Sequence, residues 1–482
     1  MDFTTKLAEI QVGERDGSAI EAVSVGEVGS LYRALQGVKD GRQRRGRRYP
    51  AAAVLTIIVL SKMAGESTLV GIAEWAQLRL ELLCGVFGLR RLPCANTYCY
   101  ICDHIELADL NQAICGYFRQ AASKPGNSPA AKAGHVPGAP TEAVPVEHIA
   151  CDGKELRGTY RRPRIACPLP ATKAAAKPAA EATAGEAVAG KATADKTTAG
   201  EATAGKATAA EATAAEATAG EATAAEATAA KAVTQGTLGI YSVTRSCMEA
   251  LLSIAGKGRE AATLLDYLSG RDCQNLVITA DALHTQRRLC RLIRRQQGHY
   301  LFVVKRNQKS LYEDIRFLFS CEPNSWFPEQ TAKTVDYGHG RIEVRRIRTT
   351  CELNLYLADQ WPGVAQVFRV ERQITEHGRT TRSFVGGITS LTPAEASPHR
   401  LLQLLRDHWH IENRNHWRRD ASLGEDACKV ASIRAALTLA MLNNAVLFLL
   451  DRAGRRNTRS AMRFFDAKPH KALDLILSPL DF

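Results

Sequence analysis

The stretch "VEHIACDGKELRGT", residues 146–159, sets an acid directly behind a largely apolar run. Residues 146–151 have the composition of a buried β-strand, and Asp152 stands where that strand runs out. A carboxylate in this position is costly to bury unless a cation neutralises it. We therefore expect a partner for Asp152, either a basic side chain or a metal ion.

A second apolar run, "LVITADA" at residues 276–282, leads into an acid in the same way, here Asp281. If the two strands are neighbours in one sheet, their carboxylates meet, and each raises the pKa of the other unless a cation lies between them. Lys154 and Lys305 are basic side chains near these strands. A pair of carboxylates is also what Mg²⁺ binds, because magnesium prefers oxygen ligands. On the residues alone, both kinds of partner stay open.

A third acid lies in "LLRDHWHIENRNHWRRD", residues 404–420, which has the periodicity of a helix. Helical spacing places four further side chains on one face with Glu412, namely Leu405, His408, His416 and Arg419. A salt-bridged surface would have the same pattern. The apolar residues Trp409, Ile411 and Trp417 predict instead that the helix is at least half buried, so that its polar face lines a cleft.

Three other acids follow in the chain and compete with Glu412 for the role of third carboxylate, namely Asp420, Glu425 and Asp426. Asp420 lies two helical turns further on, and Gly424 is expected to end or bend the helix before the last two. Glu412 lies in mid-helix between two tryptophans whose packing would fix its rotamer, as a metal site requires. We therefore predict that Glu412 is the third acid.

An arginine-rich loop, "KDGRQRRGRRYP" at residues 39–50, lies inside a segment that reads as all-helical over residues 27–122. Five arginines occupy the loop, namely Arg42, Arg44, Arg45, Arg47 and Arg48. A solvated loop is the alternative, but arginine is the residue best suited to phosphate. The formal net charge of +13 agrees with a polyanionic partner. We predict a helical DNA-binding domain here.

Three segments are expected to lie outside the packed parts of the chain: a tail, a linker between the two domains, and a loop inserted within the second domain. We expect residues 1–26 to form a tail and residues 123–145, rich in Ala, Gly, Pro and Ser, to form a linker. Residues 166–232 are a tract of Ala, Thr, Lys and Glu that becomes a pentapeptide array. A five-residue repeat advances about 140° net around a helix, so no apolar stripe forms on one face. We expect a surface loop without a catalytic role.

The rest of the chain alternates strands and helices, as in an α/β domain over residues 146–482. Residues 331–391 are rich in β-branched and basic residues and predict a β-rich insertion. The apolar run near residue 440 is interrupted by Asn443 and Asn444, so it predicts a buried helix rather than a membrane span. The N-terminus lacks the pattern of a signal peptide, and we expect a cytoplasmic protein.

The 13 cysteines are scattered, which does not suit a disulfide framework in a large cytoplasmic protein. One cluster combines Cys94, Cys99, Cys102 and His104. A structural zinc site needs four well-spaced ligands, and no second pair of Cys or His completes this one. We expect small helix residues there and no zinc.

Five motifs in order carry a resemblance to a known family: "ACDGKELRGT", "VITADALHTQ", "YLFVVKRNQKSLYEDI", "GHGRIEVRRI" and "HWHIENRNHWRRDASLGEDA". They resemble the motifs of DDE transposases from bacterial insertion sequences, in the branch that includes the H-repeat-associated proteins. The resemblance implies an RNase H-like mixed sheet with a β-rich insertion, preceded by an all-helical domain. It also implies a short connection where the low-complexity tract lies.

The resemblance further implies that Asp152, Asp281 and Glu412 are the catalytic acids and hold two Mg²⁺ ions, for which Mn²⁺ can substitute. The implied function is cut-and-paste transposition, with Mg-dependent cleavage of DNA and strand transfer. The family's Tyr-Arg-Glu-Lys signature is only partly matched, because Leu405, His408 and Arg419 stand at its other positions.

The partner implied is double-stranded DNA, both terminal inverted repeats and target DNA, bound by a homodimer at the bacterial nucleoid. Beyond the arginine loop, the side chains that we expect to contact DNA are Lys154, Arg287, Arg291, Lys305, His408 and Arg419. Two rival functions stay open: a nuclease of the same fold that cuts without joining, and a non-enzymatic DNA-binding remnant of a transposon.

Overall fold

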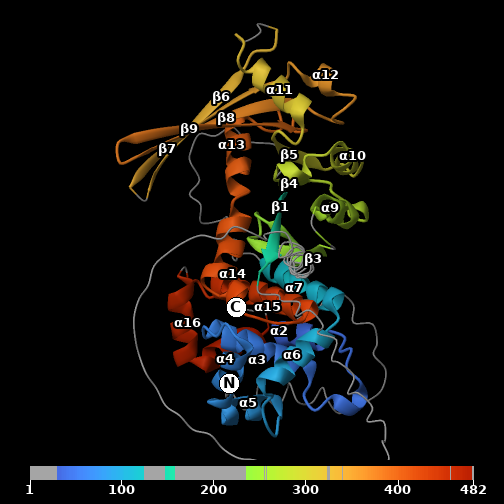
Figure 1. Ribbon diagram of the computed structural model, residues 1–482, viewed down its shortest axis with the longest axis vertical. Coiled ribbons are helices and arrows are strands. Elements are labelled where there is room, and N and C mark those ends of the chain that lie inside the picture. Colours follow the sequence, from blue (N-terminus) through green and yellow to red (C-terminus); the bar gives the residue numbers. More distant parts are fainter. Residues whose placement is uncertain are drawn as a thin grey trace, which may run out of the picture. The chain divides into compact units, whose positions relative to one another are not determined.

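The computed structural model describes residues 30–123, 147–157 and 235–479, apart from residues 255, 257, 323–325, 339 and 456 (Figure 1). The predicted tail, the low-complexity tract and all of the predicted linker except its first residue lie outside the described residues. Helices at both ends of the described chain enclose a hydrophobic core, and a nine-stranded sheet lies between them in sequence.

The N-terminal segment is helical. Its elements are α2 (Leu31–Gln36), the 3₁₀ turn η2 (Arg44–Gly46), α3 (Ala51–Met63), α4 (Leu69–Gln77), α5 (Leu80–Phe87), α6 (Ala95–His104) and α7 (Leu107–Ala122). Pro50 precedes α3, and every residue of that helix after the first is buried. The Ser30 and Thr68 hydroxyls accept hydrogen bonds from the first turns of α2 and α4, which fixes where these helices begin.

The sequence predicts one helix over residues 69–88, and this prediction is wrong, because the helix breaks before Leu80. Arg79 has the non-helical angles φ −122° and ψ 31°. Its guanidinium is held 2.7 Å from a carboxylate oxygen of Asp466 and lies over the ring of Trp75. The break thus coincides with a contact to a distant acid, which the local periodicity does not indicate.

Three C-terminal helices complete the helical core: α15 (Ile433–Arg452), α16 (Thr458–Ala467) and α17 (Pro469–Leu477). α15 packs against α3, α6 and α7, and one face of strands β1 to β3 joins the same core. α15 is long and apolar enough to cross a membrane, but 83% of its most apolar window is buried inside the protein. The N-terminal helices and the C-terminal end of the α/β part therefore share one hydrophobic core.

All nine strands belong to one mixed sheet of order β3-β2-β1-β4-β5-β9-β8-β7-β6. Their bounds are β1 (Glu147–Leu156), β2 (Gln235–Ser242), β3 (Cys247–Ile254), β4 (Leu276–Ala280), β5 (His299–Val304), β6 (Gln330–Gly338), β7 (Arg341–Thr350), β8 (Gln366–Glu376) and β9 (Arg379–Thr389). β1, β4 and β5 are parallel, whereas the other pairs are antiparallel. This arrangement confirms the predicted α/β class with a mixed sheet.

The β-rich segment predicted at residues 331–391 continues the central sheet. β9 pairs with β5 through the register Leu301↔Thr389, so β6 to β9 extend one edge of it (Figure 1). The connecting helices are α9 (Glu260–Ser269), α10 (Arg287–Arg295), α11 (Lys309–Leu318) and α12 (Asn354–Leu357). This extension forms one wall of the cleft described below.

Lys62 near the end of α3 is an exception in the helical core, because its side chain is buried and its Nζ atom has no hydrogen-bond partner among the described residues. Burial lowers the pKa of Lys62 below its usual value, although Glu425 and two cysteines act in the opposite direction. The charged form of this lysine therefore opposes folding.

We expect Lys62→Met to stabilise the protein by about 1–3 kcal/mol near neutral pH, the range for an unpaired buried polar group. A lowered folded pKa means that the unfolded chain binds the extra proton, so the wild-type lysine costs most below its folded pKa. The advantage of Lys62→Met should therefore shrink as the pH rises toward 10.5, the usual lysine value. Urea unfolding at several pH values measures it, and a loss of stability in the methionine variant would contradict the prediction.

Candidate active site

Asp152 and Asp281 lie at corresponding places on neighbouring strands. β1 and β4 are parallel, and Cys151 pairs with Ala280 in register. In both segments the residue that follows this pair is an acid. The Asp281 carboxylate accepts a hydrogen bond from the backbone N–H of Leu283, and it thereby caps the 3₁₀ turn η4 (Ala282–His284). Asp152 accepts one from the N–H of Gly153. The prediction that the first strand ends at Asp152 is wrong, because pairing with β2 continues β1 to Leu156, whereas Asp281 directly follows β4.

Glu412 lies in a π-helix, η5 (Ile411–His416), which joins α13 (Pro398–Asp407) to α14 (Trp417–Ala421). The prediction of a regular α-helix through this segment is therefore wrong. The widened turn is closed by the N–H of Trp417, which donates to the carbonyl of Glu412. Such π-turns occur often at functional sites.

The two tryptophans beside Glu412 are not buried, against the prediction. Trp409 and Trp417 are 60% and 59% exposed. Ile411 and His416 anchor the π-helix instead, and both pack over Gly239 of β2, which pairs directly with Asp152. A Cβ atom at residue 239 would lie 3.3 Å from Ile411 and 3.4 Å from His416, so the glycine permits this close approach.

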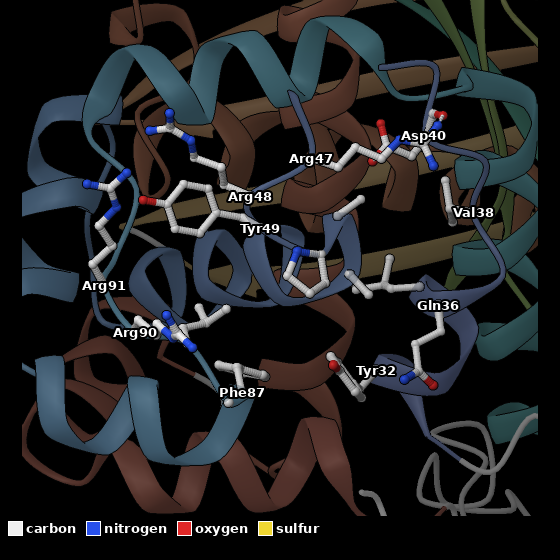
Figure 2. Close-up of a pocket in the computed structure, with 16 residues that line it drawn as sticks. Tyr32, Gln36, Val38, Asp40, Arg47, Arg48, Tyr49, Phe87, Arg90 and Arg91 are labelled. Atoms are coloured by element: carbon white, nitrogen blue, oxygen red, sulfur yellow. Dashed lines mark hydrogen bonds and ion pairs between the residues drawn. The ribbon is translucent and has the colours of Figure 1, made fainter. Parts of the chain in front are cut away.

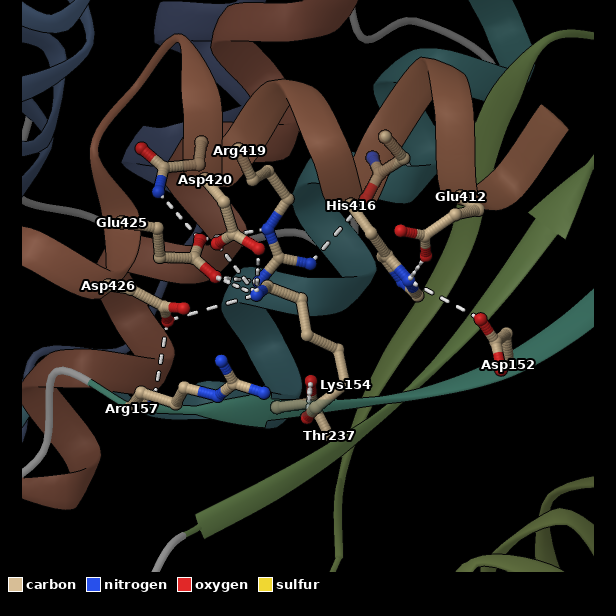
Figure 3. Close-up of polar contacts among 12 residues, drawn as sticks. Asp152, Lys154, Arg157, Thr237, Glu412, His416, Arg419, Asp420, Glu425 and Asp426 are labelled. Carbon is tan, nitrogen blue, oxygen red and sulfur yellow. Dashed lines mark hydrogen bonds and ion pairs between the residues drawn. The ribbon is translucent and has the colours of Figure 1, made fainter. Parts of the chain in front are cut away.

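His416 lies between two of the acids (Figure 3). Its Nδ1 atom is 3.2 Å from a carboxylate oxygen of Glu412 and 3.5 Å from one of Asp152. One ligand atom from each of these residues lies within 4.8 Å of the others. An imidazole in this place bridges two carboxylates that would otherwise repel each other.

Electrostatics in the group follow from this bridge. Burial acts to lower the pKa of His416, but its hydrogen bonds with Asp152 and Glu412 outweigh burial and raise it. Burial acts to raise the pKa of Asp152, and contact with His416 outweighs it, so the pKa is lowered. For Glu412 the hydrogen bond with His416 is the largest cause, and its pKa is also lowered. Both acids are therefore held as carboxylates.

A cleft of about 1360 Å³ joins this group to Asp281. Asp152, Asp281 and Glu412 all line it, and its opposite wall comes from β6 to β9. Lys305 also lines the cleft and is exposed. His408 lines it as well, but its Nδ1 atom is 3.0 Å from the Thr279 hydroxyl, which ties the ring to the sheet. The cleft thus brings together the three acids predicted from the sequence.

The donor set fits a divalent metal ion. Asp152 and Glu412 supply close carboxylates, and Asp281 directly follows β4, the strand that pairs with β1. Mg²⁺ is bound in proteins through few carboxylates and completes its shell with water and phosphate, for which an open cleft leaves room. The Nδ1 atom of His416 lies close to oxygens of both Asp152 and Glu412, and one ligand atom from each of the three residues could reach the same ion.

The competing acids have other partners (Figure 3). Lys154 Nζ is 2.7 Å from both carboxylate oxygens of Asp420 and within 4 Å of Glu425 and Asp426. Arg419 is fully buried and makes two hydrogen bonds to Glu425. These acids therefore form a separate ionic cluster.

Three side chains that were predicted to contact DNA are instead buried in ion pairs within the protein. Lys154 and Arg419 belong to the ionic cluster just described and are not free to meet phosphate. Arg42 is 3% exposed, pairs with Asp40 at 2.7 Å and donates to the carbonyl of Tyr49. Sequence reasoning missed these roles because the partners of Lys154 and Arg419 come from distant or loop positions.

The remaining arginines predicted to contact DNA lie at the surface. Arg44, Arg45 and Arg48 are exposed, whereas exposed Arg47 donates to the carbonyls of Asp40 and Arg42. On and near α10, Arg287 and Arg291 are exposed too, and Arg287 donates to the Gln360 side chain. These side chains are accessible to a large anionic partner.

Two residues of the site were not proposed from the sequence as ligands or neighbours of the acids. His416 was placed only on the face of Glu412, and its spacing of four residues was the available signal. Glu260 at the start of α9 was missed: a Cβ atom on Gly153 would lie 2.9 Å from its carboxylate. Burial, and then Asp281 and Asp152, raise the pKa of Glu260. No local motif marks it.

Two family models match this chain, one over the helical segment and one over the part that contains the sheet. A helical segment followed by a mixed α/β sheet is consistent with an RNase H-like domain. Residues 32–118 match the family model described as DDE_Tnp_1-associated, and residues 244–449 match the one described as Transposase DDE domain. The chain belongs to this DDE transposase family. Asp281 and Glu412 lie within the second match, and Asp152 precedes it.

Curated relatives agree. "H repeat-associated putative transposase YhhI" of Escherichia coli strain K12 is 28% identical over 47% of this chain and 61% of its own length. "Putative protein YbfL" of the same strain is 26% identical over the same shares. "Putative transposase YncI" of Escherichia coli O157:H7 is 25% identical over 40% of this chain and 50% of its own. The matched part of this chain thus spans about three fifths of the first two relatives.

Proposed function

We propose that this protein is a transposase of a bacterial insertion sequence, which binds the ends of the element and catalyses metal-dependent cleavage and strand transfer of double-stranded DNA. The observation that carries the proposal is the meeting of Asp152 and Glu412 around His416, in a cleft that Asp281 also lines. The family match supports DNA as the substrate. The proposed place of action is the bacterial cytoplasm at the nucleoid, and the proposed acting form is a homodimer.

Asp152, Asp281 and Glu412 would hold the metal ions, of which two Mg²⁺ are proposed, with Mn²⁺ as a substitute. When bound, such ions lower the pKa of a water or DNA hydroxyl and neutralise charge on the phosphate. His416 positions the carboxylates of Asp152 and Glu412 through its Nδ1 atom. Lys305 at the cleft edge is placed to attract the DNA backbone. The reaction needs no covalent bond between enzyme and DNA.

We expect the purified protein to cut a duplex that carries the DNA flanking its gene, in Mg²⁺ or Mn²⁺ and not in EDTA. The cut ends should join to a second, target duplex, because a transposase directs the free 3′-hydroxyl to phosphodiester attack. Gel analysis of labelled strands separates the outcomes. Cleavage without joined product would indicate a nuclease, and binding without metal-dependent cleavage would indicate a DNA-binding remnant.

A further inference from the structure

A second hollow lies in the helical part, between two loops that are far apart in sequence (Figure 2). Its volume is about 850 Å³. One loop precedes α3 and supplies Arg47 and Arg48, and the other joins α5 to α6 and supplies Arg90 and Arg91. Only the first loop is expected from its sequence to contact DNA, so the meeting of the two loops is a structural finding.

Three of the four arginines have no competing partner. Arg48, Arg90 and Arg91 are exposed, and no hydrogen bond or ion pair joins them to any residue that the structure describes. Arg47 differs, because it donates to backbone carbonyls and lies 3.7 Å from the Asp40 carboxylate. Asp40, the one acid in the lining, is thus already matched by Arg42 and Arg47. The free guanidinium groups leave the hollow with an excess of positive charge.

Aromatic side chains line the floor of the hollow, and a hydrogen bond fixes one of them. Tyr49 lies between Arg48 and Arg91, and its hydroxyl donates to the carbonyl of Leu92 (Figure 2). The rings of Tyr32 and Phe87 lie 5.6 Å apart on the same lining. Tyr49 therefore ties the loop before α3 to the loop after α5, and it holds the arginines of both loops around one space.

We propose that this hollow binds the sugar-phosphate backbone of double-stranded DNA, with Arg48, Arg90 and Arg91 on the phosphates and the aromatic floor against a deoxyribose. The inference rests on the proposed function and adds to it a DNA contact outside the catalytic cleft. Guanidinium groups bind phosphate in a forked geometry that suits successive phosphates of a backbone. An acidic polypeptide is the other class of anionic partner, and the experiment distinguishes it.

The test compares the double variant Arg90→Ala/Arg91→Ala with a matched control, Arg316→Ala/Arg463→Ala, which removes two exposed arginines elsewhere. Binding of a labelled short duplex is measured by fluorescence anisotropy across a range of salt. We expect the first variant to bind at least about tenfold more weakly, and its log–log salt slope to fall by about two, since each lost phosphate contact removes about 0.9. The control should lose much less of either.

A charge-preserving variant, Arg90→Lys/Arg91→Lys, should recover most of the slope, because lysine keeps a point charge at each phosphate. An unchanged slope in Arg90→Ala/Arg91→Ala, or displacement of DNA by polyglutamate at equal charge concentration, would overturn the inference. If the inference fails but the wild type cleaves DNA, the proposed function stands. If the wild type does not bind DNA at all, both the proposed function and the inference are wrong.

Discussion

Glu412→Gln should abolish metal-dependent cleavage, with a loss of at least about a thousandfold, while DNA binding and thermal stability stay close to wild type. The amide keeps the size of the side chain and removes the charge that a divalent cation needs, and metal ions supply several kcal/mol of transition-state stabilisation. Folding should be spared because Glu412 is partly exposed and Ile411 anchors the π-helix in its place. Single-turnover cleavage of a labelled duplex measures the effect.

The matched control for this variant is Glu313→Gln, which neutralises an exposed carboxylate on α11 away from the cleft. It should cleave at wild-type rate. Asp152→Asn should be as inactive as Glu412→Gln, since the two carboxylates share His416. A Glu412→Gln protein that still cuts DNA would show that the third ligand comes from another acid.

The second large effect is on stability. Arg419→Met should destabilise the protein by about 3–5 kcal/mol, the usual cost of leaving one member of a buried ion pair uncompensated. Arg419 is fully buried and makes two hydrogen bonds to Glu425, which is itself 8% exposed. The midpoint of thermal unfolding should fall by on the order of 10 °C. Calorimetry or denaturant unfolding provides the measurement.

Two comparisons test the cause. Arg419→Met/Glu425→Leu removes both charges, so it should recover much of the lost stability. Glu106→Gln breaks the half-exposed pair with Arg434 and should cost at most about 1 kcal/mol. Burial acts to raise the pKa of Glu425, but Arg419 outweighs it and the pKa is lowered. Wild-type stability from this group is thus present above the usual value of 4.5 and is lost as the pH falls through the lowered pKa.

The strands that carry the acids could be predicted from sequence, because an apolar run that ends on an acid is a local pattern. Asp281 directly follows β4 as predicted, whereas Asp152 lies inside β1, because pairing with β2 continues that strand to Leu156. The π-helix could not be predicted, since four-residue spacing between Glu412 and His416 fits an α-helix equally well. The exposure of Trp409 was also missed, because the cleft lies where a packing partner was expected.

The basic residues show a second limit of local reasoning. The free charge of an arginine or lysine depends on whether an acid from another segment reaches it. Asp420 reaches Lys154 across 266 positions of the chain, and Glu425 turns back onto Arg419 through a bend at Gly424. Arg90 and Arg91 form only a single pair in the sequence, so no DNA contact was predicted for them. In the fold they line the same hollow as Arg48.

The packing of α3 against α15 has a consequence for how the protein is made. The ribosome produces α15 about 370 residues after α3, so at about 5–20 residues per second the first helix waits roughly 20 to 70 s for its partner. During that interval an almost wholly apolar segment is available to chaperones that hold nascent chains. We expect a message broken before α15 to yield a product that cannot close its core and is open to proteolysis. Folded protein is therefore expected to accumulate only from chains translated through α15.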